Sequence, residues 1–239
     1  MTEMRITMTY KDGFIKGLPI CLGYLPVAFT FGFMAVTGGL PAWISILISM
    51  SNVTSSGQFA GTTLILANAS YVEITITTLI INLRYMLMSL ALSQKTSSSS
   101  SLINKLIYSF VITDETFAIA SMEKEPITSA YMYGLITLPY IGWAAGTILG
   151  AFSTGIMPDS LKGAMGIALF AMFISLFIPP AKHSHNVAIV VALSIFITCI
   201  LKYIPALSFI SAGFRIIIAT LISAGFGALF LPEEESDNV

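Results

Sequence analysis

The chain has 239 residues, of which 56% are hydrophobic and 10% are charged, and its formal net charge is -1. A soluble domain carries about 25% charged residues, so this composition, with a mean hydropathy of +0.87, indicates an integral membrane protein. The near-neutral charge provides no basic face for phosphates, and a nucleic-acid partner is not expected. We expect one polytopic membrane domain over residues 1–239, with a cytoplasmic N-terminal segment at 1–16 and an acidic C-terminal tail at 232–239.

Apolar segments long enough for membrane helices recur along the whole chain. The hydrocarbon core of a bilayer is about 30 Å thick and needs about 20 apolar residues per helix. Short Gly-, Pro- and Ser-rich breakers separate the segments, which lie at 17–37, 42–67, 71–93, 103–121, 129–151, 161–180, 187–204 and 212–231. This pattern predicts an all-α membrane protein.

Basic residues predict the orientation, because they favour the cytoplasmic side. They precede the first segment and flank the serine run after the third: Arg5, Lys11, Lys16, Lys95 and Lys105. Both places are cytoplasmic only if an even number of crossings separates them, which holds if segment 42–67 is re-entrant. We therefore expect about seven transmembrane helices plus one broken or re-entrant helical hairpin. The acidic loop at Glu123 and Glu125 then falls outside.

Two segments resemble each other. Residues 17–41 and 134–158 both contain an early Leu-Pro, several small residues, and a Thr-Gly followed by proline. In the orientation above they cross in opposite directions. Inverted repeats are common in secondary transporters, and their broken helices mark the binding site. A chance similarity between glycine-rich helices is the alternative.

The first segment contains a helix-breaking motif. Pro26 removes a backbone donor, and Gly23 loosens the same turn. The freed carbonyls can coordinate a ligand, and Tyr24 offers a hydroxyl beside them. A simple kink that lets neighbouring helices pack is the alternative interpretation.

The second segment carries many polar side chains, from residue 49 to residue 58. In a bilayer these groups cost free energy unless they face protein or water. If the chain unwinds near 55–57, the half-helix beginning at Gln58 presents free N–H groups that bind carboxylates. The alternative is helix packing, since hydroxyl and small residues hold membrane helices together.

Charged residues within predicted spans are functional candidates, because they are costly in the bilayer. Arg84 lies inside segment 71–93, and a position at the cytoplasmic headgroups is its alternative. Asp114 and Glu115 lie near the middle of segment 103–121, about 100° apart on a helix. We expect one to pair with Arg84 while the other faces a cavity or takes up a proton. A purely structural ion pair between two helices is equally compatible with the pattern.

These observations give two sets of candidate residues. The substrate-binding set is Gly23, Tyr24, Pro26, Asn52, Ser55, Gly57, Gln58 and Phe59. The coupling or gating set is Asn82, Arg84, Asp114 and Glu115. A substrate carboxylate is expected at the amides near Gly57 and Gln58, and its ammonium at carbonyls around Gly23 and hydroxyls of Tyr24 or Ser55. No metal site or cofactor is predicted.

Several short motifs make the chain resemble the AzlC family of branched-chain amino acid permeases, of the azaleucine-resistance type. In chain order they are Gly17-Leu18-Pro19-Ile20, Gly23-Tyr24-Leu25-Pro26, Phe31-Gly32, Gln58-Phe59, Asn82-Leu83-Arg84 and Thr113-Asp114-Glu115-Thr116-Phe117. They span roughly residues 13 to 120. The chain departs from the family at Tyr85, where His is frequent.

The resemblance implies export of leucine, isoleucine or valine across a bacterial plasma membrane, together with a small hydrophobic AzlD-like membrane subunit. ATP is not expected, since the chain lacks a Walker-type phosphate loop. The alternatives are transport of another small solute, a non-transporting membrane subunit, or a membrane-embedded enzyme. The enzyme is disfavoured, because the chain lacks a nucleophile–histidine set, a well-spaced acid pair and a metal constellation.

Overall fold

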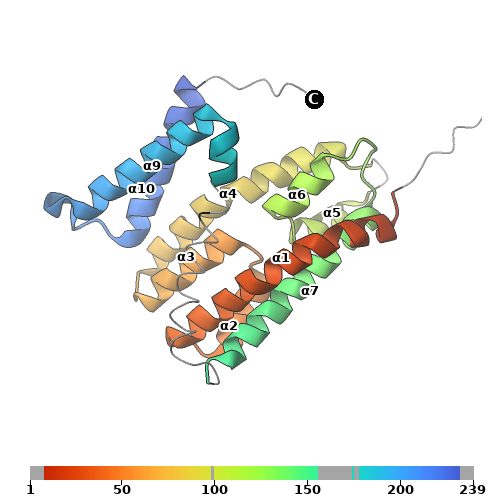
Figure 1. The fold of residues 1–239 in the computed structure, drawn as a ribbon, viewed down its shortest axis with the longest axis horizontal. Coiled ribbons are helices and arrows are strands. Elements are labelled where there is room, and N and C mark those ends of the chain that lie inside the picture. The colour runs from red at the N-terminus through yellow and green to blue at the C-terminus, as the bar shows by residue number, and fades with distance from the viewer. Residues whose placement is uncertain (1–7, 98–99, 156–173, 175–177, 232–239) are drawn as a thin grey trace, which may run out of the picture.

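The computed structural model describes residues 8–97, 100–155, 174 and 178–231, and its named elements are helices (Figure 1). They are α1 (Tyr10–Thr37), α2 (Ala42–Ser51), α3 (Ser55–Leu66), α4 (Tyr71–Lys95), α5 (Leu102–Ser109), α6 (Asp114–Ser121), α7 (Ser129–Ser153), α9 (His185–Tyr203), the 3-10 turn η1 (Pro205–Leu207) and α10 (Ala212–Phe230). Within these residues α1, α4, α7, α9 and α10 are long and apolar enough to cross a membrane. The expected all-α membrane fold is confirmed. Most of the expected span 161–180, the basic residue Arg5 and the tail 232–239 lie outside the described residues.

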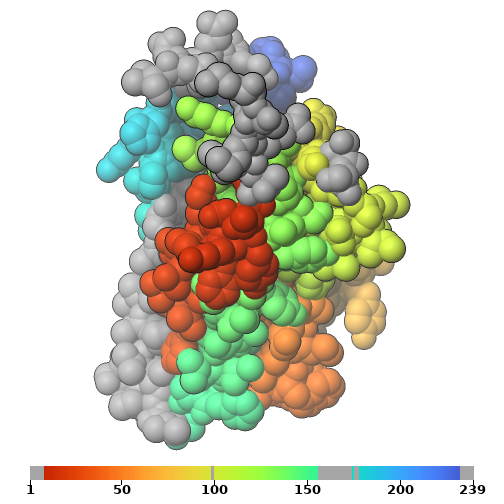
Figure 2. Space-filling model, turned by 90° about the vertical axis from the view of Figure 1, so that its right-hand side faces the viewer, coloured from red at the N-terminus to blue at the C-terminus, as the bar shows by residue number. Residues whose placement is uncertain are grey.

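The centre of the fold is the pair α1 and α7, which lie side by side along their whole length (Figure 1). Glycines on both helices let the backbones touch, as at Gly17 against the Leu135 carbonyl and Gly150 against Phe29. Small residues drive helix association in membranes, because they allow this close approach. Figure 2 views the end of the pair at which both helices begin, with the start of α1 in red next to residues of α7 in green.

The two helices run parallel, since the contacts advance together along both chains: Gly13 meets Tyr131, and Gly32 meets Thr147. The prediction that segments 17–41 and 134–158 cross in opposite directions is therefore wrong for the residues described. The similarity between them reflects a shared need for small residues at one interface. The predicted interruption of the first segment at Gly23 to Pro26 is also wrong, because α1 continues as one helix through Pro26.

The predicted re-entrant hairpin at 42–67 is present as α2 and α3. Helix α1 ends at Thr37, and Gly38 lies against the Leu66 side chain at the end of α3. The chain therefore enters and leaves on one side. Phe59 of α3 packs edge-on against Phe31 of α1 at a centroid distance of 5.4 Å and fixes the returning half against the core.

The segment 103–121 is a second hairpin, and its prediction as a full span is wrong. Helices α5 and α6 have 8 residues each, so each is about 12 Å long and cannot cross a core of about 30 Å. Thr113 ends the turn between them with a capping box, in which its hydroxyl accepts from the Thr116 amide. The chain then returns to its entry side, where the Lys95 ammonium at the end of α4 donates to the Ser121 carbonyl.

This second hairpin reverses the predicted side of the loop that contains Glu123 and Glu125. Lys16 of α1 forms an ion pair with Glu123, and the Thr128 hydroxyl donates to the Met8 carbonyl at 2.6 Å. The loop therefore lies on the same side as the start of α1, and its predicted position on the opposite side is wrong. We call this the N-terminal side of the protein.

The first six helices form two units of the same order and opposite direction. Helix α1 leaves the N-terminal side and precedes the hairpin α2–α3, while α4 returns to that side and precedes the hairpin α5–α6. Both long helices begin at a hydroxyl cap, Thr9 in α1 and Ser70 in α4. The two hairpins thus enter from opposite sides. Helices α9 and α10 pack together and join α4, where buried Glu73 accepts from the Gly213 amide at 2.7 Å.

We expect Gly17→Ala to destabilise the protein, because the added Cβ would lie 2.6 Å from the Leu135 carbonyl oxygen and only backbone movement could relieve it. Overpacking of this kind costs about 1–3 kcal/mol. The melting temperature of the detergent-purified protein should fall by several degrees. Gly225→Ala in α10 is the matched control, since a Cβ there meets no atom within 4 Å. Equal melting temperatures for both variants would contradict the close α1–α7 contact.

The second hairpin can be tested by the side on which its loop is labelled. In a chain with Cys21 and Cys199 replaced by serine, Lys11→Cys and Glu125→Cys should react with a membrane-impermeant maleimide from the same side. Both native side chains are exposed, so each new thiol is accessible. Labelling from opposite sides of the membrane would show that 103–121 crosses the bilayer.

Candidate functional site

A cavity of about 380 Å³ lies where the two hairpin tips meet against α1 and α7. Small-molecule sites have volumes of about 300–1,000 Å³ and combine apolar walls with a few polar groups. The lining residues are Pro19, Ile20, Gly23, Tyr24, Val27, Val53, Ser55, Tyr85, Thr113, Asp114, Glu115 and Trp143. They come from α1, both tips, α4 and α7. The cavity therefore has the size and the mixed chemistry of a small-molecule site.

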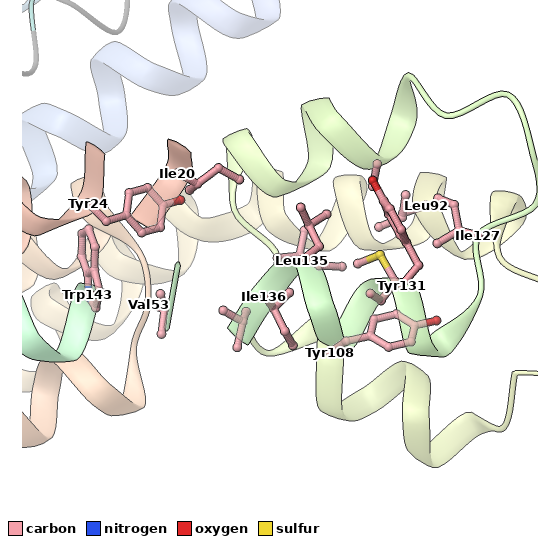
Figure 3. Packing of buried hydrophobic residues seen from close by; sticks show 14 of the residues in the cluster. Ile20, Tyr24, Val53, Leu92, Tyr108, Ile127, Tyr131, Leu135, Ile136 and Trp143 are labelled. Atoms are coloured by element: carbon pink, nitrogen blue, oxygen red, sulfur yellow. The ribbon is translucent and has the colours of Figure 1, made fainter. Parts of the chain in front are cut away.

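Tyr24 connects α1 to the second tip. Its hydroxyl lies 2.5 Å from Glu115 Oε2 and 2.6 Å from the Thr113 hydroxyl. Its ring meets Trp143 of α7 edge-on at 5.0 Å, with Val53 of the first tip nearby (Figure 3). One side chain thus touches both the polar and the apolar part of the cavity wall.

The first tip ends at an uncapped helix. Residues 52–54 are non-helical, and the Thr54 side chain makes no cap hydrogen bond to α3, because it donates to Asn52 Oδ1 at 3.1 Å. The first backbone bond of this helix runs from the Gln58 amide to the Thr54 carbonyl at 3.0 Å. The amides of residues 55–57 precede that bond and have no partner within the helix. Ser55 lines the cavity, so the positive end of this helix lies at the cavity wall.

The predicted start of the half-helix at Gln58 is therefore wrong by one turn. Helix α3 begins at Ser55, because the tip 52–54 already supplies the unwound backbone. The amide of Gln58 is bonded within the helix, and Ser55 is the residue of this first turn that lines the cavity.

Arg84 and Asp114 form the predicted ion pair, with Arg84 Nη1 3.1 Å from Asp114 Oδ2. The guanidinium also donates to the Ser56 hydroxyl at 2.9 Å and to the Tyr85 hydroxyl at 3.0 Å. It therefore links α4 to the first turns of both α3 and α6. Since the pair joins the two hairpins, it can hold the tips together.

The structure gathers part of each candidate set. The cavity is lined by Gly23, Tyr24, Ser55, Asp114 and Glu115, whereas the remaining candidates lie outside its lining: Pro26, Asn52, Gly57, Gln58, Phe59, Asn82 and Arg84. Gln58 is 1% exposed, and neither side-chain amide atom has a hydrogen-bond partner. Gly57 lies against the Asn82 side chain, which a Cβ would strike. Gly57 and Gln58 are therefore packed within the protein and do not face the cavity.

Seven lining residues were not among the candidates: Pro19, Ile20, Val27, Val53, Tyr85, Thr113 and Trp143. The sequence around Trp143 gave no indication that it lines a site, because an aromatic residue in a membrane helix usually packs against other helices. Tyr85 was visible only as a departure from the family pattern. Val53 lies between polar neighbours, and its role follows from the meeting of the two tips.

A second polar contact joins α1, the loop before α7 and α7 itself on the N-terminal side, near the cavity. Glu123 binds the Lys16 ammonium and accepts from the Tyr131 hydroxyl at 2.5 Å. A smaller hollow there is lined by Lys16, Pro19 and Glu123, and Pro19 also lines the main cavity. Burial opposes ionisation of Glu123, but the hydrogen bonds from Lys16 and Tyr131 outweigh it, so its pKa lies below the ordinary value of 4.5.

This lowered pKa predicts a pH-dependent stability. Because the folded-state pKa of Glu123 is below its unfolded value, the pair stabilises the protein above about pH 4.5, and this stabilisation is lost as pH falls through the folded-state pKa. Glu123→Gln should lower the melting temperature at neutral pH, and the difference from the unaltered protein should shrink as the pH falls below the ordinary pKa of 4.5 and through the lower folded-state pKa. Glu125→Gln, at an exposed side chain of the same loop, serves as control. A difference that persists in acid would contradict the assignment.

Comparison with known proteins identifies relatives over most of the chain. A family model described as AzlC protein matches residues 19–157. An uncharacterized membrane protein of Archaeoglobus fulgidus is 30% identical over 187 residues, covering 77% of this chain and 82% of the relative. The inner membrane protein YgaZ of Escherichia coli is 26% identical over 192 residues, covering 77% and 78%. The branched-chain amino acid transport protein AzlC of Bacillus subtilis is 22% identical over 177 residues, covering 73% and 68%. No solved structure matches this chain.

Proposed function

This chain belongs to the AzlC family, and on that premise we propose that it is a secondary transporter that exports branched-chain amino acids. The observation that carries the proposal is the cavity at the meeting point of two hairpins that enter from opposite sides. Broken helices that meet within the membrane are the usual binding sites of secondary transporters. The name of the Bacillus subtilis relative supports the same substrate class.

The chemistry of the cavity suits a small amphipathic solute. The uncapped amides at the start of α3 favour a carboxylate, and Val27, Val53 and Trp143 offer an apolar wall for a branched side chain. We assign substrate contact to the binding candidates that line the cavity, Gly23, Tyr24 and Ser55. The other binding candidates do not line the cavity, and we assign them to the shape of α1, the first tip and α3: Pro26, Asn52, Gly57, Gln58 and Phe59.

Alternating access would work through the link between the tips. Arg84 and Asp114 join α4 to α6, and Arg84 also reaches Ser56 of α3. Asn82 supports the same turn of α3 through Gly57. If these contacts exchange partners as the cavity changes sides, the pair acts as a gate between the two hairpins. The energy would come from an ion gradient or from the substrate gradient itself.

The proposal includes the setting of the protein. We place the protein in the bacterial plasma membrane with its N-terminus in the cytoplasm. Its expected partner is a small hydrophobic AzlD-like membrane subunit. Transport of a different small solute is the alternative, because the cavity would also accept other amphipathic molecules of similar size.

Radiolabelled leucine efflux from loaded cells tests the function. Cells that make the protein with its small partner should lose leucine faster than cells without it. Asp114→Asn should reduce the added efflux at least about tenfold, because it leaves the Arg84 charge without its counter-ion. Membrane levels of both proteins, measured by immunoblot, provide the control. Unchanged efflux of leucine, isoleucine and valine with the partner present would contradict the substrate and favour another solute.

A further inference from the structure

The charges that line the cavity do not balance. Asp114 is neutralised by Arg84 at 3.1 Å. Glu115, the next residue, lies half-buried on the cavity wall. Among the described residues no Lys, Arg or His forms an ion pair with it. Within the part of the chain that the structure describes, the cavity therefore holds one carboxyl group without a cationic partner.

The hydrogen bond from Tyr24 satisfies only part of that carboxylate. A carboxylate offers about four acceptor positions, and the Tyr24 hydroxyl occupies one of them on Oε2 at 2.5 Å. A half-buried carboxylate in a mostly apolar cavity is stabilised best by a cation at hydrogen-bond distance. The site is therefore complementary to a positively charged group with N–H donors.

The first hairpin tip, at the start of α3, favours a negatively charged group. The amides of residues 55–57 precede the first hydrogen bond of α3, and Ser55 lines the same cavity as Glu115. Helix N-termini favour anions. The two tips thus offer an anion site and a cation site within one cavity, and the apolar wall lies beside them.

We propose that Glu115 is the counter-ion for the ammonium group of the substrate and selects α-amino acids over the matching 2-oxo acids. This inference rests on the proposed function and changes the expected ammonium contact. Helix α1 is continuous through Gly23, so most of its carbonyls serve the helix. The carboxylate of Glu115 is the stronger partner for a charged donor.

The test compares leucine with two analogues that keep its carbon skeleton. Proteoliposomes that contain the protein and its small partner exchange external radiolabelled leucine for internal leucine. Unlabelled leucine, 4-methyl-2-oxopentanoate and 3-methylbutylamine compete: the oxo acid lacks the ammonium, and the amine lacks the carboxylate. Exchange needs no ion gradient, so the loss of a coupling proton cannot imitate the loss of an ammonium contact.

Glu115→Gln removes the charge but keeps the size and the acceptor for Tyr24. We expect it to raise the half-inhibitory concentration of leucine at least about tenfold, with that of the oxo acid unchanged or lower. Glu125→Gln makes the same change at an exposed loop position, and it should leave the half-inhibitory concentrations of both leucine and the oxo acid unchanged. Glu115→Asp, which keeps the charge on a shorter side chain, should fall between the unaltered protein and Glu115→Gln.

The outcomes separate the two levels of the proposal. Suppose that Glu115→Gln raises the half-inhibitory concentrations of leucine and of the oxo acid equally, or raises neither. Either result would overturn the role of Glu115 and leave the transport function intact. Failure of the unaltered protein to exchange leucine, isoleucine or valine would overturn both. If exchange by Glu115→Gln is too slow to measure, ligand-induced thermal stabilisation of the purified proteins gives the same comparison, since only bound ligand stabilises the fold.

Discussion

Every unwound stretch of backbone in a bilayer must be covered by protein or water, and this constraint shapes the molecule. The two hairpin tips, 52–54 and 110–113, are such stretches. They are covered because α1 and α7 approach each other at glycines such as Gly17 and Gly150 and form one continuous wall. Tyr24 and Trp143 project from that wall to the tips. The site thus depends on a contact between two helices that leaves no room for a Cβ at these glycines.

The same constraint explains why the charges occur where they do. A lone guanidinium in this environment would be costly, but Arg84 meets Asp114, Ser56 and Tyr85 within 3.1 Å. The cost of burial is thereby offset by contacts that also tie the hairpins to α4. Glu115 lacks an equivalent cation among the described residues, and its single phenol contact leaves the cavity receptive to a positive group.

The sequence predicted the features that leave a local chemical trace. Polar residues at 49–58 and the parity of basic residues indicated the first hairpin, and Arg84 with Asp114 indicated the ion pair. The second hairpin was missed because its turn, Phe110 to Ile112, is as apolar as a continuous span. Only the Thr113–Thr116 capping box marked a new helix start. The parallel contact of α1 and α7 could not be predicted, because small residues indicate a close neighbour and not its direction. The full lining of the cavity could not be predicted either, because it requires both the second hairpin and the parallel contact of α1 and α7.

A zwitterion suits this arrangement for a reason beyond simple complementarity. A ligand shifts a conformational equilibrium only through different affinities for the two states. A solute held by one tip alone would bind equally well wherever the other tip lay. A solute whose carboxylate meets α3 and whose ammonium meets α6 loses one contact when the tips separate. The two hairpins enter from opposite sides, so the state that binds both ends is the one in which the two tips lie together at the cavity. Under the proposed function, the charge separation within the substrate is therefore what couples its binding to closure of the cavity.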